Sequence, residues 1–545
     1  MAKHDLRKKV LEDVLKIQMV PETSLNRLKA TLEGRLEWCI SRQRIWGVPI
    51  IALLCVHCDY VFTNKKFIDD IAEHFAKDGI EYWDTVDIKS LLKDLSCPNC
   101  KKADFEKEMD ILDVWFDSGI SHFAVLKNNS ELKFPADIYL EGKDQHRGWF
   151  QSSLLTSGVL EGEACTKAIV THGYTVDERG RKMSKSLGNV IKPQDLMEKL
   201  GTDGLRLWSS SIDLKDDPII SEALMRNVKE VHSKIRNTCR FLLSNLYDFD
   251  IKKNAVPVEE LLWIDQYALN HLYAFNEKIQ RNYKDYHFTG VFHEFANYCA
   301  KDLSSFYLDI IKDRLYVERP DSKYRRSVQT VCWHILDSLT KLMAPILSFT
   351  AEIISDYYQK DKISSIHLQS FADITLLWEK LVNEIQSRPF YKDYLEKYPA
   401  EKNKKLLYWD QQWDLVINIR NAILKAIEEK RALGIIKHSR EARIIAYLDA
   451  NKKEIYQLQL FLNDLANLSG QSIEDFFREF LIVSQFDLID SDEELNPSEY
   501  NGMYLDVQQS QFDKCPRCWQ YTVTQGPNKL CNRCQNILQV ISQNK

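Results

Sequence analysis

The sequence predicts three structures in succession, namely an α/β region, a bundle of long helices and a small C-terminal module held by cysteines. Between about residues 35 and 215, short β-rich runs bounded by turn signals alternate with helical segments, which is the pattern of a βα region. Beyond that region, apolar residues recur every three or four positions, as on the buried stripe of a bundle helix. Two C-x-x-C pairs then lie close together in residues 511–545.

Length and composition limit the class of protein. A chain of 545 residues is too long for one hydrophobic core and, at roughly 150 residues per domain, corresponds to about three or four domains. With 44% hydrophobic and 28% charged residues, it is an ordinary globular chain, neither disordered nor fibrous. The net charge of −6 excludes a global basic field, so any nucleic-acid contact must use local patches. No uncharged run approaches the ~18 residues of a membrane span, and we expect a cytoplasmic protein.

The α/β region is preceded by a helix. Apolar residues at helical spacing predict this helix, which ends before Pro21: Leu6, Val10, Val14 and Ile17. The β-rich runs that follow, and that we expect to form strands, are residues 48–56, 136–140, 167–172 and 205–212.

The helical region contains one long apolar stripe and is followed by an acidic segment. The stripe consists of Phe292, Phe295, Cys299, Leu303, Phe306 and Ile310. Residues 473–499 carry nine acidic side chains against the single basic Arg478. We therefore expect an acidic linker or a surface strand and loop at this place.

The terminal cysteines have the spacing of a metal site. They form two C-x-x-C pairs twelve residues apart: Cys515, Cys518, Cys531 and Cys534. In a reducing compartment, two such turns present four thiolates to one tetrahedral zinc ion more often than they form disulfides. A segment this short folds only with the metal. Basic residues surround it, and they suit either a phosphate-binding surface or ordinary solvation.

Four earlier cysteines predict a second zinc site. They form two pairs separated by 38 residues: Cys55, Cys58, Cys97 and Cys100. This separation is long for one zinc ribbon, but an intervening helical segment can bring the two pairs together. We interpret His57, between the first two cysteines, as a bystander rather than a ligand.

A loop between Gly180 and Asn189 carries candidate catalytic cations. Its sequence, GRKMSKSLGN, places Lys182 and Lys185 between glycines and serines, just after the strand expected to end near His172. Cations in such a loop suit a pyrophosphate leaving group, on which charge grows in the transition state. On charge alone, a solvated turn is the alternative. No G-x-x-x-x-G-K-[ST] motif is present to offer another nucleotide site.

Several strings make the chain resemble a known family. KMSKS resembles the ATP loop of class I aminoacyl-tRNA synthetases, and four strings occur in the order found in bacterial isoleucyl-tRNA synthetases. They are WCISRQRIWGVP (38–49), DVWFDSG (113–119), YLEGKDQHRGWF (139–150) and KMSKS (182–186). SFYLDIIKDR (305–314), APILSFTAE (344–352) and the terminal cysteines extend the resemblance to nearly the whole chain. Valyl and leucyl relatives share KMSKS and ISRQ, but EGxDQHRGW and the terminal cysteines favour the isoleucyl type.

The resemblance implies a fold and a division into domains. It implies the second half of a Rossmann-type catalytic part, a helical anticodon-binding bundle and a small zinc module that contacts tRNA. We accordingly expect an N-terminal remnant (1–34), the catalytic part (35–215) with a zinc-knuckle insertion (about 53–105), the anticodon-binding domain (216–440), an α/β junction with the acidic linker (441–510) and the zinc module (511–545).

The resemblance also implies roles for particular residues. Those expected to hold the ribose and adenylate are Glu141, Gly142, Asp144 and Gln145. His172 and Gly173 are expected at the adenine, and Lys182 and Lys185 at the phosphates. Trp46 and Trp149 are expected to form the walls of the isoleucine pocket. That pocket must be apolar and closely shaped, because isoleucine differs from valine by one methylene, worth only ~1–3 kcal/mol. The implied substrates are ATP with Mg²⁺, L-isoleucine and tRNA(Ile), and the implied cofactor is one Zn²⁺ or two.

One expected motif is missing. No two of the thirteen histidines lie three positions apart, so the family's His-Ile-Gly-His motif is not in this sequence. In the family order, the first catalytic half and most of the editing insertion would precede residue 1. Three hypotheses remain open. The first is an enzyme part, otherwise monomeric, that is either a natural split subunit or a fragment of a longer reading frame and is active only with its N-terminal half. The others are a non-catalytic tRNA-binding protein and a functionless relic. The intact motifs favour the first.

Overall fold

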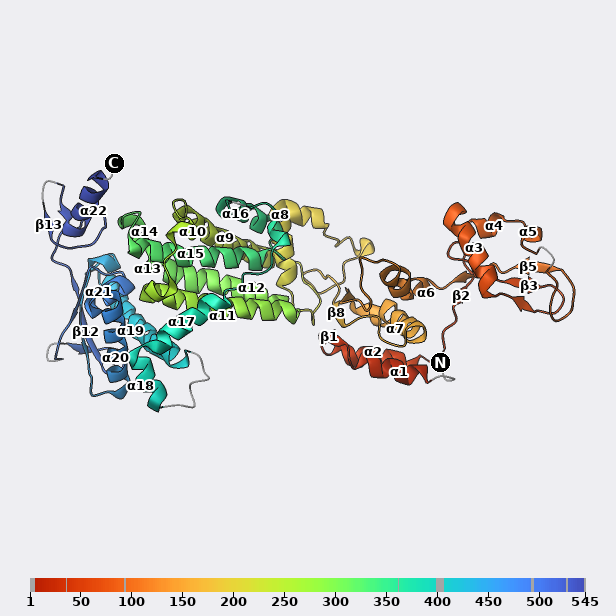
Figure 1. The fold of residues 1–545 in the computed structure, drawn as a ribbon, viewed down its shortest axis with the longest axis horizontal. Helices are drawn as coiled ribbons and strands as arrows, with labels where there is room; N and C mark the ends of the chain where they lie inside the picture. The colour runs from red at the N-terminus through yellow and green to blue at the C-terminus, as the bar shows by residue number, and fades with distance from the viewer. Residues whose placement is uncertain are drawn as a thin grey trace. The chain divides into compact units, whose positions relative to one another are not determined.

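The computed structural model divides into two compact units (Figure 1). Unit 1 comprises residues 1–190 and 212–221, and unit 2 comprises residues 191–211 and 222–545. The residues that the structure describes are 5–35, 37–92, 95–360, 362–397, 406–491, 495–525 and 528–543. None of the described helices is both long enough and apolar enough to cross a membrane.

Unit 1 is built on a three-stranded parallel sheet with the strand order β1-β8-β7. The expected first helix is confirmed for Leu6–Val14 (α1), but it ends before Ile17, and β1 (Gln18–Val20) and α2 (Ser24–Gly34) follow. The expected strands at 136–140 and 167–172 correspond to β7 (Tyr139–Gly142) and β8 (Ala168–His172). Helix α7 (Trp149–Leu160) connects β7 to β8 and packs against α1, which gives the crossover that parallel strands require.

The core of unit 1 lies on one side of this sheet. Phe150 and Leu154 of α7 are buried there with Val14 of α1, Leu28 of α2 and Ile169 of β8. Burial of α7 is not confined to one stripe, because its serines and threonine are buried as well: Ser152, Ser153, Thr156 and Ser157. This packing holds β7 and β8 in place, and the loops that carry the expected site residues begin at the carboxyl ends of these two strands.

An antiparallel insertion interrupts unit 1. Its sheet has the order β4-β3-β5, formed by β3 (Leu53–Cys55), β4 (Val61–Phe62) and β5 (Phe105–Lys107). Three helices lie between β4 and β5: α3 (Lys65–Asp78), α4 (Tyr82–Thr85) and α5 (Ile88–Leu92). The strand expected at 48–56 is thus only three residues long. A further pair, β2 (Ser41–Arg42) with β6 (Ile111–Leu112), lies at the base of the insertion, before α6 (Val114–Gly119).

The strand expected at residues 205–212 is wrong, because residues 205–210 belong to helix α8 (Pro193–Ser210) of unit 2. Pro193 stands at the first helical position, where its missing N–H costs nothing. Asp203, Gly204, Leu207 and Trp208 are buried at helical spacing. The apolar run that suggested a strand is therefore one face of a helix.

Unit 2 begins as a helical bundle. Its long helices include α9 (Glu222–Asn245), α11 (Trp263–Lys284), α15 (Lys323–Met343) and α19 (Leu407–Ala432). The shorter ones include α10 (Ile251–Asn254), α12 (Phe288–Asn297), α13 (Leu308–Ile310), α14 (Lys312–Val317), α16 (Ser348–Tyr358), α17 (Thr375–Ser387) and α18 (Pro389–Lys397). The expected stripe from Phe292 to Ile310 faces the core, but a π-helix (Tyr298–Tyr307) shifts it, so that Tyr307 is buried and Phe306 only partly.

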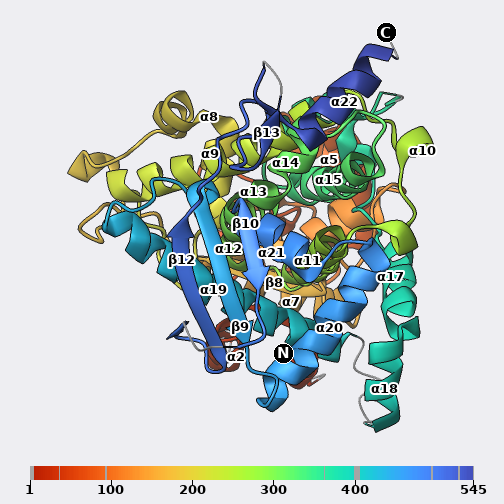
Figure 2. The same cartoon turned by 90° about the vertical axis from the view of Figure 1, so that its left-hand side faces the viewer.

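The acidic segment is not a linker. Residues 473–481 form helix α21 (Ile473–Leu481), which buries Phe476, Phe477 and Phe480. The segment continues into β10 (Gln485–Leu488) of a sheet with the order β10-β9-β12-β11 (Figure 2). The other strands are β9 (Ala442–Leu448), β11 (Asn496–Pro497) and β12 (Met503–Gln509), and α20 (Lys453–Ser469) follows β9. Residues 492–494 lie outside the described part.

The chain ends in a small module within unit 2. It consists of β13 (Thr524–Gln525), β14 (Leu530–Cys531) and α22 (Asn532–Gln543). The two strands pair antiparallel, with Thr524 opposite Cys531. Cys515 and Cys518 lie before β13, Cys531 ends β14 and Cys534 lies in the first turn of α22.

Candidate functional site

The carboxyl ends of β7 and β8 bring four of the expected site residues together. Gly142 of β7 is in register with His172 of β8, so Glu141 and Gly142 lie beside His172 and Gly173 at one edge of the parallel sheet. The side chains of Glu141 and His172 are exposed there. Ligands of open α/β sheets bind at this edge, because the loops that leave it diverge from the strands.

The turn after β7 adds Asp144 and Gln145 to this edge. The Gln145 side-chain oxygen accepts a hydrogen bond of 3.1 Å from the Trp149 amide at the start of α7. Gln145 Nε2 donates to the Asp144 carboxylate at 3.4 Å, and the side chain of Asp144 is exposed. A Cβ at Gly142 would lie 2.7 Å from Asp144 Oδ1, so the glycine allows the carboxylate to sit directly over the backbone.

Two residues that we did not predict hold the turn after β8. Asp217 accepts hydrogen bonds from Lys143 Nζ at 2.5 Å and from the Tyr174 amide at 2.8 Å. The Lys143 ammonium thereby lowers the pKa of Asp217. A Cβ at Gly173 would lie only 2.2 Å from Asp217 Oδ1, so this approach requires glycine. No local pattern in the sequence connects Asp217 to a turn more than forty residues earlier.

The KMSKS loop is organised by Asp177. This carboxylate accepts hydrogen bonds from Asn189 Nδ2 at 3.0 Å and Arg181 Nε at 2.9 Å, and from the backbone amides of Arg179 and Arg181. These bonds, that of Asn189 foremost, hold the pKa of Asp177 far below its usual range. Ser184 Oγ caps the short helix Lys185–Leu187. Asn189, three residues after the KMSKS motif, was the available signal in the sequence for this network.

Lys182 is the motif cation that the structure ties to the strand ends. Its Nζ lies 3.5 Å from the ring centroid of Tyr174, which directly follows Gly173. The loop also pairs back through a bridge between Val176 and Lys182. Lys185 is exposed in its short helix, and no contact among the described residues joins it to the strand ends.

The two tryptophans expected to form one pocket lie in different surroundings. Trp149 stacks on Tyr139 with ring centroids 4.2 Å apart and donates to the Ser118 carbonyl at 3.0 Å. Trp46 is 77% exposed. Among the described residues, no ring contact joins the two side chains, so the isoleucine pocket stays a prediction.

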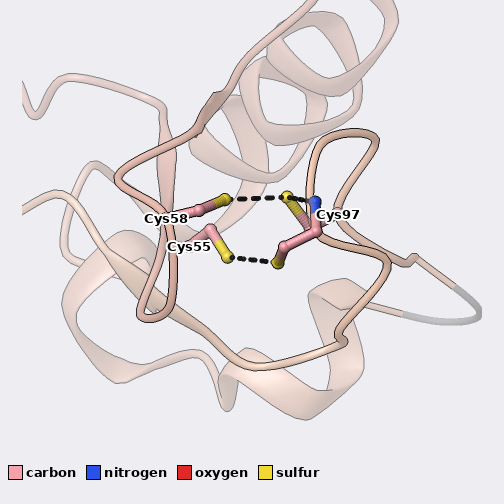
Figure 3. Close-up of side chains that lie close together, drawn as sticks. Cys55, Cys58 and Cys97 are labelled. Atoms are coloured by element: carbon pink, nitrogen blue, oxygen red, sulfur yellow. Dashed lines mark hydrogen bonds between the residues drawn. The ribbon is translucent and has the colours of Figure 1, made fainter.

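The cysteines of the insertion converge as expected (Figure 3). The sulfurs of Cys55 and Cys100 are 3.6 Å apart and those of Cys58 and Cys97 are 3.5 Å apart, with all four within 4.8 Å. Four sulfurs at the Zn–S bond length around a tetrahedral ion lie about 3.8 Å from one another. Pairing of β3 with β5 bridges the 38-residue gap. His57 instead contacts Asp104 at 2.7 Å.

The terminal cysteines form a second cluster of the same kind. All four are buried with sulfurs within 4.8 Å, and Cys518 and Cys531 are 3.7 Å apart. Each cluster can therefore hold a metal ion in a closed, all-sulfur site.

Unit 2 also contains a large groove that the sequence did not predict. It has a volume of about 1360 Å³ and lies between α9, α16 and the segment after α16. Arg236 and Arg240 are exposed one turn apart on α9. Phe349 and Tyr357 of α16 line it with 62% and 72% of their surface exposed. Exposed aromatic rings beside cations are typical of surfaces that bind single-stranded nucleic acid.

Comparison with known proteins identifies the class and then the relatives. Residues 1–221 match the family "tRNA synthetases class I (I, L, M and V)", and residues 265–446 match "Anticodon-binding domain of tRNA ligase". The chain thus carries the catalytic part of a class I tRNA synthetase, a helical anticodon-binding region and a four-cysteine cluster near its C-terminus. Within this class, its curated relatives are isoleucine–tRNA ligases.

The relatives match the whole chain but are longer. The isoleucine–tRNA ligase of Persephonella marina is 40% identical over 547 residues, which cover 98% of this chain and 54% of the relative. That of Thermotoga maritima is 38% identical with the same shares. The chain thus spans about half the length of these relatives. A solved Mycobacterium tuberculosis methionyl-tRNA synthetase in complex with methionyl-adenylate has a TM-score of 0.45 and 18% identity, over 65% of this chain and 60% of that one.

Proposed function

We propose that this chain is the part of a cytoplasmic isoleucine–tRNA ligase that holds ATP with Mg²⁺ and binds tRNA(Ile). The complete enzyme would activate L-isoleucine as isoleucyl-adenylate and transfer it to the tRNA. The observation that carries the proposal is the meeting of Glu141–Gly142 with His172–Gly173 at adjacent parallel strand ends, beside Lys182. The relatives from Persephonella marina and Thermotoga maritima, both named isoleucine–tRNA ligase, support the choice of amino acid.

The proposed chemistry needs positioning and charge, with no covalent nucleophile from this chain. Exposed carboxylates at Glu141 and Asp144, at the carboxyl end of β7, suit the hydroxyl groups of a ribose. The isoleucine carboxylate would attack the α-phosphate of ATP, and pyrophosphate would leave. Lys182 and Lys185 would neutralise the charge that grows on this leaving group.

The open edge of the sheet supports a partner. Among the described residues, β7 pairs only with β8 and forms an edge of the parallel sheet. Ile138 and Leu140 beside this edge are 38% and 57% exposed. All-parallel sheets are normally covered on both faces and extended by further strands. We propose that the N-terminal half of a synthetase, supplied separately or as part of a longer chain, pairs with β7.

Isoleucine-dependent ATP–pyrophosphate exchange tests the proposal. We expect little or no exchange from this chain alone and clear exchange after addition of the N-terminal half of the Persephonella marina relative. Exchange by the chain alone would show that no partner half is needed. Exchange that depends on valine or leucine instead of isoleucine would overturn the choice of substrate.

A non-catalytic tRNA-binding protein is the second candidate, and the groove on α9 and α16 favours it. We expect Arg236→Gln and Arg240→Gln each to weaken tRNA(Ile) binding and to lower its salt dependence by about one counterion, as loss of a phosphate contact does. Filter binding at several salt concentrations measures both, with Arg226→Gln, outside the groove on the same helix, as the control. Tight tRNA binding by a reconstituted pair that lacks exchange activity would favour this candidate.

We further propose that each cysteine cluster holds one structural Zn²⁺. The all-sulfur donor sets and the near-tetrahedral spacing of the sulfurs support zinc rather than Mg²⁺ or Ca²⁺, which take oxygen ligands. Four protein ligands leave no open position for a substrate, so the proposed role is structural. The metal would stabilise the short loops that carry the cysteines.

A further inference from the structure

The terminal cysteine cluster shares its core with the helical bundle. Val317, the last residue of α14, is 5% exposed and packs in one cluster with the four cysteines and Ile537. The cluster around Cys55 differs, because its core comes from its own insertion, including Leu53, Ile71 and Trp83. The terminal module therefore depends on a distant helix for packing, whereas the insertion does not.

Arg517 connects a cysteine of the module directly to that helix. Its Nη2 donates to the Val317 carbonyl at 2.6 Å, and its Nη1 donates to Cys534 Sγ at 3.6 Å. The carbonyls at the end of a helix carry partial negative charge, which a guanidinium stabilises. One planar side chain thus contacts both α14 and a proposed metal ligand.

Arg533 makes a second connection from between two cysteines of the cluster. It lies between Cys531 and Cys534 and reaches Asp313 at 2.6 Å and Glu318 at 2.7 Å, on α14 and directly after it. Its Nε also donates to Glu318 at 3.0 Å. A guanidinium held by two carboxylates fixes the direction of the turn that carries both thiols.

We infer that Arg517 and Arg533 are positioning residues that couple metal binding at Cys515, Cys518, Cys531 and Cys534 to docking of residues 515–543 on α14. The inference rests on the proposed zinc site. Because the same side chains contact the helix and position the thiols, docking and metal binding favour each other. Thermodynamic linkage requires the two effects to be equal, so loss of zinc loosens the docked module by the same factor by which undocking weakens zinc binding.

Zinc release and amide exchange of the full chain test the coupling. Arg533→Gln should accelerate the release of one of two zinc ions to EDTA by about fivefold or more, and should accelerate amide hydrogen exchange in residues 515–543. Residues 55–100 and their zinc serve as the internal control. Lys529→Gln is the matched control variant, because it removes the same charge from an exposed position in the module.

A partner on the bundle distinguishes coupling from local damage to the module. Glu318→Gln lies outside the module, yet it should accelerate zinc release in the same direction. The double variant Arg533→Gln/Glu318→Gln should then lose less than the sum of the two single effects, because both remove one contact. In the wild-type chain, stripping zinc with EDTA should in turn accelerate exchange in Lys312–Val317.

The outcomes separate the two proposals. A wild-type chain that holds no zinc in the terminal cluster overturns the metal proposal and the coupling with it. A chain that holds two zinc ions, but releases them at the wild-type rate in both Arg533→Gln and Glu318→Gln, overturns only the coupling. Additive effects of the two substitutions also overturn it.

Discussion

At the scale of single residues, Lys182 connects the KMSKS loop to the end of β8. Its ammonium rests on the ring of Tyr174, while Asp177 and Asn189 hold the loop around it. The cation–π contact is worth about 0.5–1 kcal/mol at such an exposed site, too little to hold the lysine when a phosphate is present. The contact with Tyr174 therefore keeps the Lys182 ammonium near the strand end, where we propose that pyrophosphate forms, and leaves it free to move to the phosphates.

We expect Lys182→Gln to lower isoleucine-dependent ATP–pyrophosphate exchange of the reconstituted pair by about 10²–10³-fold, as removal of one charge-stabilising group does. The maximal rate should fall more than the apparent affinity for ATP, because the charge develops in the transition state. Arg179→Gln, an exposed cation of the same loop, is the control. A loss of less than about threefold in Lys182→Gln would contradict the proposed role.

Asp410 is a second residue whose effect can be measured, because its raised pKa makes the stability of the protein depend on pH. Burial, and then repulsion by Asp414, raise the pKa of Asp410 to about 6, although its carboxylate accepts a hydrogen bond of 2.9 Å from Asn270. The unfolded chain would ionise this group near pH 3.9. The folded state therefore binds the proton more tightly, so the contribution of Asp410 to stability is lost as the pH rises from about 4 to about 6.

We expect Asp410→Asn to raise the free energy of unfolding at pH 7.5 by about 2 kcal/mol, since it removes the cost of a partly buried charge. At pH 4, where the carboxyl is protonated in the folded state, the difference should nearly vanish. Urea unfolding at both pH values measures this. Asp393→Asn, at an exposed position, should change neither value. Equal stabilisation at both pH values would exclude titration as the cause.

At the scale of elements, the turn after β8 depends on a glycine. A Cβ at Gly173 would approach Asp216 O to 2.6 Å and Asp217 Cα to 2.7 Å, and these backbone atoms have little freedom to move. Because glycine has no Cβ, the backbone of residues 216–217 can pack directly against Gly173 at the end of β8. The position of the candidate nucleotide site is therefore set by backbone packing as well as by charged side chains.

Gly173→Ala should lower the stability of unit 1 by about 1–3 kcal/mol, the usual cost of overpacking. Urea unfolding monitored by tryptophan fluorescence provides the measurement. Gly34→Ala is the matched control, because a Cβ at Gly34 would meet no atom within 4 Å. If the two variants were equally stable, the tight approach at Gly173 would not be a constraint on the fold.

Helix α21 shows how an element is misassigned from charge alone. Its nine residues include three acidic side chains, which suggested a solvated linker, yet its phenylalanines at positions 476, 477 and 480 follow a helical stripe. The ring of Trp263 packs against that of Phe476, with centroids 4.0 Å apart and ring planes tilted by 44°. Asp475 is exposed, whereas Glu479 is only 14% exposed and pairs with the buried Arg314, so periodicity was a more reliable signal than charge.

At the scale of the whole molecule, metal content is the simplest property to measure. We expect about two zinc ions per chain, with Cys58→Ser and Cys518→Ser each removing one of them. Atomic absorption of freshly purified protein gives the number. Loss of the terminal zinc should change the helical content only slightly, because Val317 is the one bundle residue, among those described, that packs in the core of this cluster. Fewer than one zinc ion per chain would contradict both sites.

Local patterns predicted the family, the order of the parts, the four C-x-x-C pairs and the KMSKS loop. Such features depend on residue type and short spacing, which the linear chain displays directly. The same patterns failed where one apolar run suits two structures, as at residues 205–210, which are helical rather than extended. The isoleucine pocket between Trp46 and Trp149 also remains a prediction. The resemblance implies a role for each tryptophan, but it does not say which side chains touch in this structure.

Only the tertiary structure revealed the contacts between residues far apart in the chain. It brought Gly142 into register with His172, placed Asp217 against Gly173, and set Val317 into the core of the terminal cysteine cluster. Each of these depends on how helices and strands pack after they form. Spacing along the chain encodes which side chains can bind a phosphate or a metal, whereas packing decides which of them meet.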